Sequence, residues 1–125
     1  MQLNNTDKKI ELERYDNKAV EILSSGCQAK HAKYGSDEVG LVLKSPYLSY
    51  ENILKKLLKK DMIVLEIASG TGLHTGALLN KTANIIVSDI SINSLKVLQK
   101  DRCRNGQALH AVTTDMEKLP FRTGS

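Results

Sequence analysis

The spacing of apolar residues changes near the middle of the chain and divides it into two regions. In residues 1–60, isolated apolar positions recur at the three- and four-residue intervals of an amphipathic helix. The pattern predicts a helix over residues 7–24 and another over residues 45–59, with Pro46 in its first turn. Residues 26–44 give no regular pattern. We therefore expect residues 1–60 to form an amino-terminal helical cap region.

Residues 61–125 have a different pattern, in which short continuous apolar runs alternate with amphipathic segments. The runs predict three buried strands, over residues 62–67, 83–88 and 108–113. The segments between them predict helices over residues 73–79 and 91–103, the second capped by Ser91. Continuous apolar strands joined by helices are typical of a parallel sheet covered on both faces. The predicted fold class is α/β, a partial Rossmann-like cofactor-binding domain with β-α-β-α-β order, preceded by the amino-terminal helices.

Composition narrows the class of protein. The chain has 125 residues, enough for one domain, and its 4% aromatic content means that aliphatic residues must form the core. Its two cysteines lack the spacing of a zinc site or a disulfide framework. The net charge of +4 is spread along the chain, with no clear nucleic-acid signature. No apolar run approaches the roughly 20 residues that span a bilayer, so we expect a soluble, cytoplasmic protein.

The first predicted strand ends in a glycine-containing loop that could hold a nucleoside. Gly70 and Gly72 allow a tight turn and a close approach of the backbone to a ligand. Glu66, Asp89 and Asp115 lie at or just past the ends of the three strands, where ligands bind in such sheets. Asp89 follows Gly70 by 19 residues, and a carboxylate there can accept hydrogen bonds from both hydroxyls of a ribose.

Glu66 favours one class of nucleoside cofactor over another. Dinucleotide-binding loops place a third glycine three residues after the second. Here that position is Thr75, and the nearest glycine is Gly76. A carboxylate four residues before Gly70 would also lie unfavourably beside a pyrophosphate, whereas it suits a cationic ligand group, directly or through water. The loop therefore favours a sulfonium nucleoside over a nicotinamide dinucleotide.

Residues 64–72, with the sequence VLEIASGTG, resemble the first motif of class I S-adenosylmethionine-dependent methyltransferases. The resemblance implies that Glu66 orients the methionine amino end of the cofactor. It also implies that Ala68, Gly70 and Gly72 let the backbone approach the cofactor. Ala68 stands where the family more commonly has glycine.

The resemblance extends to the next two strand ends. Residues 115–121, with the sequence DMEKLPF, are similar to the segment that follows the family's third strand. By this resemblance Asp89 holds the ribose and Ile90 packs on the adenine. Asp115 would accept a hydrogen bond from the adenine amino group, and Met116 would donate its backbone N–H to the ring.

The family's sheet continues to a fourth strand that flanks the first, and the printed chain stops before it. We therefore expect this chain to be the amino-terminal half of such an enzyme, a fragment or truncated product. The strand at residues 62–67 would then be an exposed apolar edge, which invites self-association.

The predicted function is methyl transfer from S-adenosylmethionine to an unidentified small-molecule acceptor. The alternatives are a fragment of a nicotinamide-dependent oxidoreductase and a truncated, non-catalytic cofactor-binding module. His74 is interpreted as a helix-start residue rather than a catalytic base. No acid–base pair is identifiable in the sequence, so no catalytic residue is assigned, and no metal site is expected.

Overall fold

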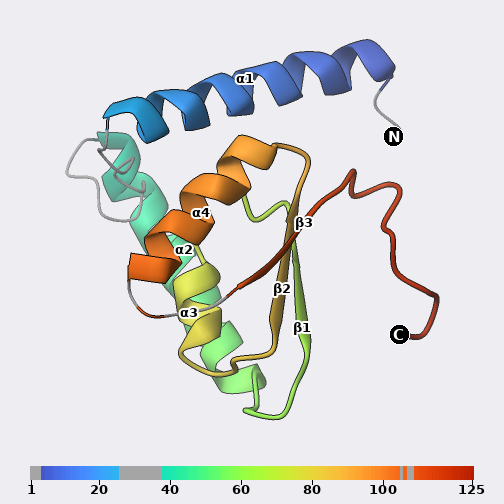
Figure 1. Cartoon of the computed structure of the whole chain (residues 1–125). Helices are drawn as coiled ribbons and strands as arrows, with labels where there is room; N and C mark the ends of the chain where they lie inside the picture. Colours follow the sequence, from blue (N-terminus) through green and yellow to red (C-terminus); the bar gives the residue numbers. More distant parts are fainter. Residues whose placement is uncertain (1–3, 26–37, 105, 107–108) are drawn as a thin grey trace.

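The structure is a computed structural model that describes residues 4–25, 38–104, 106 and 109–125. Its elements follow one another as α1 (Asn5–Ser25), α2 (Glu38–Leu57), β1 (Val64–Ile67), α3 (Thr75–Leu79), β2 (Ile85–Asp89), α4 (Ile92–Arg104) and β3 (His110–Thr113) (Figure 1). Most of the irregular segment of the sequence, residues 26–37, lies outside the described residues.

The three strands form one parallel sheet in the order β1-β2-β3. Val64 lies opposite Ile85 across the first pair of strands, and Ile86 lies opposite His110 across the second. This arrangement confirms the predicted Rossmann-like parallel sheet with its crossover helices. Each strand begins two residues later than the apolar runs predicted, and all three end within one residue of the prediction.

The core is aliphatic and lies on one side of the sheet, between the strands and the helices. Figure 1 shows α2, α3 and α4 together on this side. The fully packed cluster consists of Leu78, Ile85, Val87, Leu95 and Leu98. Burying each such side chain stabilises the fold by about 1.5 to 3 kcal/mol. On the opposite side of β1, Leu65 and Ile67 remain 36% and 44% exposed.

The second helix starts earlier than the sequence pattern predicted. Proline is favoured in a first helical turn, so Pro46 placed the predicted start at residue 45. In the structure α2 begins at Glu38 and Pro46 lies inside it, which makes that boundary wrong. A proline within a helix removes one hydrogen bond to the carbonyl four residues back. Pro46 is exposed, so water can reach the carbonyl that loses its partner.

Helix α1 is capped and then anchored on α4. The side chain of Asn4 accepts hydrogen bonds from the backbone N–H groups of Thr6 and Asp7, which starts the helix two residues earlier than predicted. Ser91 caps α4, as predicted, by accepting the N–H of Ser94 at 3.0 Å. The Ser91 hydroxyl donates to Asp16 of α1 at 2.7 Å. The boundary at residue 60 between the amino-terminal helical cap region and the cofactor-binding domain stays a prediction.

Candidate functional site

The loop between β1 and α3 contains three residues in the left-handed region of backbone conformation. Their φ angles are 56° at Ala68, 53° at Gly70 and 91° at Gly72. A methyl group added at Gly70 would meet no atom within 4 Å, so the loop is open on that side. A methyl group added at Gly72 would lie 2.2 Å from the Cδ1 atom of Leu98. Gly70 therefore leaves room for a ligand, whereas Gly72 is needed for the loop to pack on α4.

The backbone of Ala68 has a left-handed conformation that favours glycine, although the residue carries a Cβ atom. For an L-residue this conformation costs roughly 1 to 2 kcal/mol, although glycine loses more entropy on folding. We expect Ala68→Gly to raise the free energy of unfolding by about 0.5 to 1 kcal/mol, measured by urea denaturation. The matched control is Ala83→Gly at an exposed loop position without a positive φ, which should lower stability. A loss of stability in Ala68→Gly as large as in the control would contradict the prediction.

Asp89, the last residue of β2, holds the glycine loop against the start of the next helix. Its Oδ2 atom accepts the N–H of Gly70 at 2.8 Å, and its Oδ1 atom accepts the N–H of Ser91 at 2.9 Å. A carboxylate can accept about four hydrogen bonds, so two positions remain for other donors such as ribose hydroxyls. Asp89 thus has an organising role in the loop in addition to the ligand contact predicted for it.

Glu66 lies beneath the first turn of α3. Its Oε2 atom accepts a hydrogen bond from the hydroxyl of Thr75 at 2.7 Å, and Thr75 is fully buried. Burial raises the pKa of the Glu66 carboxyl, against the opposing effects of the Thr75 hydrogen bond and the positive charge of Arg102. A partly buried carboxylate next to the loop is well suited to pairing with a cation, because its own charge is incompletely compensated.

A cavity of about 140 Å³ lies at the carboxyl ends of the strands, bounded by the 114–117 segment and α1. Four of the predicted site residues line it together, and they are Ala68, Ile90, Asp115 and Met116. The other four do not line it. Glu66 and Asp89 lie near the ends of β1 and β2, and Gly70 and Gly72 lie in the adjoining loop. The hydrogen bond between Gly70 and Asp89 fixes the loop to the end of β2. The next residue, Ile90, lines the cavity, so the loop and the cavity are neighbours.

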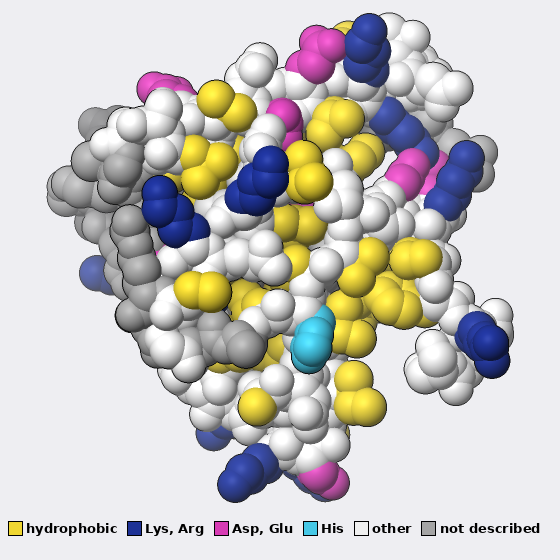
Figure 2. Space-filling model, in the orientation of Figure 1, with side chains coloured by type: hydrophobic (Ala, Val, Ile, Leu, Met, Phe, Trp, Pro, Cys, Tyr) yellow, Lys and Arg dark blue, Asp and Glu magenta, His cyan; other side chains and the backbone are white. Residues whose placement is uncertain are grey.

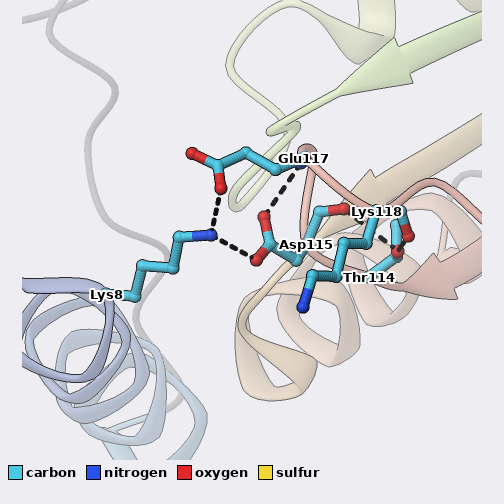
Figure 3. Close-up of polar contacts among 5 residues, drawn as sticks. All are labelled: Lys8, Thr114, Asp115, Glu117 and Lys118. Carbon is cyan, nitrogen blue, oxygen red and sulfur yellow. Dashed lines mark hydrogen bonds and ion pairs between the residues drawn. The ribbon is translucent and has the colours of Figure 1, made fainter. Parts of the chain in front are cut away.

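Asp115 is held in a tight turn and contacts α1 (Figure 3). Its Oδ1 atom accepts the N–H of Glu117 at 2.9 Å, and its carbonyl accepts the N–H of Lys118 at 2.9 Å. Its Oδ2 atom lies 2.7 Å from the Nζ atom of Lys8, which also pairs with Glu117. The hydrogen bond from Lys8 holds the pKa of Asp115 below its ordinary value, and the same bond raises the pKa of Lys8.

Two contacts near the loop and the cavity were not predicted from the sequence, that of Lys8 with Asp115 and that of Glu51 with His74. The Nδ1 atom of His74 lies 3.1 Å from the Oε1 atom of Glu51, whose residue is only 5% exposed. The rings of Tyr47 and Tyr50 meet the imidazole edge-on. His74 lies at the start of α3, as predicted, in the N-cap position, but its side chain makes no capping bond to the helix. A carboxylate that orients an imidazole is an arrangement capable of acid–base chemistry.

Several other kinds of site find no support in the described part of the chain. Within residues 4–25, 38–104, 106 and 109–125, no group of three or more His, Cys, Asp or Glu side chains is placed to hold a metal ion. Nor does any helix in these ranges have the length and apolar character needed to cross a membrane. The Lys and Arg side chains on the face in Figure 2 are scattered rather than gathered in one patch.

Comparison with known proteins agrees with this geometry. A family model described as a methyltransferase domain matches residues 64–125. A search of curated proteins found no match. Among solved structures, a putative S-adenosyl-L-methionine-dependent methyltransferase from Methanococcus maripaludis is similar with a TM-score of 0.51 and 22% identity. The match covers 75% of this chain and 47% of that one.

Two further structures extend the similarity over most of this chain. An S-adenosylmethionine-dependent methyltransferase from Clostridium acetobutylicum matches with a TM-score of 0.51 and 16% identity, covering 87% of this chain and 39% of that one. A phosphoethanolamine N-methyltransferase 1 from Haemonchus contortus matches with a TM-score of 0.52 and 16% identity, covering 88% and 23%. This chain thus spans less than half the length of these relatives. Residues 64–125 form a methyltransferase domain, and through it the chain belongs to the S-adenosylmethionine-dependent methyltransferases.

Proposed function

We propose that this protein transfers a methyl group from S-adenosylmethionine to a small-molecule acceptor, with this chain supplying the cofactor-binding part. The observation that carries the proposal is the glycine loop, which is open beside Gly70 and bonded to the carboxylate of Asp89. A loop that is open but fixed in position can bring its backbone close to a ligand without first having to order itself.

The residues around the loop fit the parts of the cofactor. The carboxylate of Asp89 has two acceptor positions left for the ribose hydroxyls. Ile90 and Met116 offer apolar surface to the adenine, and Asp115 offers an acceptor at its edge. Glu66 supplies negative charge toward the methionine end. When bound, the cofactor supplies a methyl group on a positively charged sulfur, and the chain contributes positioning and the exclusion of water.

A small-molecule acceptor is supported by one of the similar structures. The Haemonchus contortus enzyme was solved in complex with phosphoethanolamine and S-adenosylhomocysteine. No catalytic residue is assigned here. A cytoplasmic location stays a prediction, as does self-association through β1, whose Leu65 and Ile67 are partly exposed.

Calorimetric titration with S-adenosylhomocysteine tests the proposal, with Asp89→Asn as the informative variant. The asparagine side chain can still accept a hydrogen bond from the loop, but it lacks the charge and half of the acceptor capacity. We expect the affinity to fall by about tenfold or more, as for the loss of a hydrogen bond to a charged group. Asp61→Asn, at an exposed position before β1, is the matched control and should bind like the wild type.

The same titration separates the proposal from its alternatives. Binding of a nicotinamide dinucleotide in place of S-adenosylhomocysteine would favour an oxidoreductase. Equal affinity in the wild type and in Asp89→Asn would contradict the ribose assignment. Binding of S-adenosylhomocysteine without methyl transfer to any tested acceptor would favour a non-catalytic cofactor-binding module.

A further inference from the structure

Helix α1 reaches the predicted nucleoside pocket through two residues, Lys8 and Glu11. The ammonium group of Lys8 lies between the carboxylates of Asp115 and Glu117, and 18% of the Lys8 side chain is exposed (Figure 3). Lys8 and its helix neighbour Glu11 both line the cavity. The contact joins residues 107 positions apart in the sequence. The amino-terminal helix is therefore part of the pocket wall in this structure.

The ammonium group occupies the acceptor that the cofactor is proposed to use. The Oδ1 atom of Asp115 already accepts the backbone N–H of Glu117, and its Oδ2 atom lies 2.7 Å from the Nζ atom of Lys8. The Oδ2 atom keeps a second lone pair, so what hinders an adenine amino group there is the bulk of the Lys8 side chain beside it. With Lys8 in place the cavity measures about 140 Å³, below the roughly 300 Å³ at which ligand pockets usually begin.

The amino-terminal end of α1 can move without detaching the whole helix. The only buried residue of α1 is Ala19, in its second half. Asp16 anchors the helix by accepting hydrogen bonds from Ser91 and from the Asn93 side chain, each at 2.7 Å. Lys8 precedes Asp16 by eight residues, or about 12 Å along the helix axis. The first turns of α1 are thus held on the 115–117 turn mainly by the ion pairs of Lys8.

We propose that Lys8 is the gate residue of the nucleoside pocket: in the free protein it occupies the carboxylate of Asp115, and it gives up this contact when the ligand's amino group binds there. The inference rests on the proposed function, since it takes Asp115 as the acceptor for adenine. Binding then replaces an ion pair with a hydrogen bond from a neutral donor to the carboxylate, and the amino-terminal turns of α1 move away from the turn at residues 115–117. The cost of breaking the Lys8 ion pairs lowers the apparent affinity for the cofactor.

The test is the affinity for S-adenosylhomocysteine of the full protein and of Lys8→Met, measured by calorimetry at low and high salt. Methionine keeps the length of the side chain and removes its charge. We expect Lys8→Met to bind about three- to tenfold more tightly, as for two partly exposed ion pairs that no longer oppose binding. Added salt should reduce the difference in affinity between Lys8→Met and the wild type, because it screens the ion pairs that only the wild type must break. A lysine that only stabilises the fold would not produce this salt dependence.

Lys9→Met is the matched control, because Lys9 is on the same helix, 76% exposed and paired only weakly with Glu13. Unchanged or weaker binding by Lys8→Met would overturn the gate, and so would an equal gain in Lys9→Met. Asp115→Asn separates the two proposals. If Asp115→Asn weakens binding while Lys8→Met has no effect, the cofactor site stands and the gate is wrong. If no form binds S-adenosylhomocysteine, the proposed function fails and the gate fails with it.

Discussion

Replacing Gly72 with alanine should lower the free energy of unfolding by about 2 to 5 kcal/mol, measured by urea denaturation. Two costs add. The φ angle of 91° is strained for any residue with a Cβ atom, and the new methyl group would lie 2.2 Å from the Cδ1 atom of Leu98. The Leu98 side chain has no room to yield, because it is fully buried in the aliphatic core. The substitution therefore disturbs both the loop and the packing of α4.

Gly70→Ala is the matched comparison for Gly72→Ala. Gly70 has a similar left-handed backbone, with φ of 53°, but a methyl group there meets no atom within 4 Å. We expect it to cost roughly 1 to 2 kcal/mol of stability, from backbone strain alone. It should weaken binding of S-adenosylhomocysteine more than it weakens the fold, because the methyl group enters the open side of the loop. Equal stability losses in the two variants would contradict the packing role given to Gly72.

The sheet and its loop could be predicted from the sequence because their signals are local. A run such as residues 62–67 is apolar except at Glu66, and Ser69 and Gly70 follow it closely, so one short segment specifies both the strand and its end. Ser91 likewise predicted the start of α4, because serine is a favoured N-cap residue, and its hydroxyl does accept the capping bond. The same logic places Glu66, Asp89 and Asp115 at one edge of the sheet, where parallel strands bring their carboxyl ends together. The roles expected for Ala68, Ile90 and Met116 came from the family resemblance and stay predictions.

The sequence contains no local signal for the contacts between segments that lie far apart along the chain. Nothing in the sequence connects Lys8 to Asp115, and the pair forms only because α1 packs across α4. The pairing of Glu51 with His74 likewise depends on α2 packing against α3, which no spacing in the sequence reveals. The start of α2 was predicted wrongly because a local signal, the position of Pro46, was misleading. The rule for Pro46 is a statistical preference, and at an exposed position water can reach the carbonyl whose hydrogen bond the proline removes.

Glu66→Gln should weaken binding of S-adenosylhomocysteine by about tenfold or more and at the same time stabilise the ligand-free protein at neutral pH. The loss of affinity is that of a hydrogen bond to a charged group. The gain in stability follows from burial, which raises the pKa of Glu66 above its ordinary value of 4.5. The folded protein therefore holds the proton more tightly than the unfolded chain, and stability falls as the pH rises from 4.5 through the raised pKa. Glutamine has no proton to lose and can still accept the hydrogen bond from Thr75.

The difference in free energy of unfolding between wild type and Glu66→Gln, measured from pH 4 to pH 8, isolates this carboxyl from the others. The advantage of Glu66→Gln should grow as the pH rises, whereas Glu13→Gln, at an exposed position on α1, should show no such trend. Binding adds a second signature. Pairing with the ligand's ammonium group lowers the pKa of Glu66, so mildly acidic titrations of the wild type should release protons that Glu66→Gln does not. An advantage independent of pH, or equal proton release by both proteins, would mean that Glu66 is already well compensated and does not meet the ammonium group. The residue that costs stability in the free protein would then not be the one that holds the cofactor's amino end.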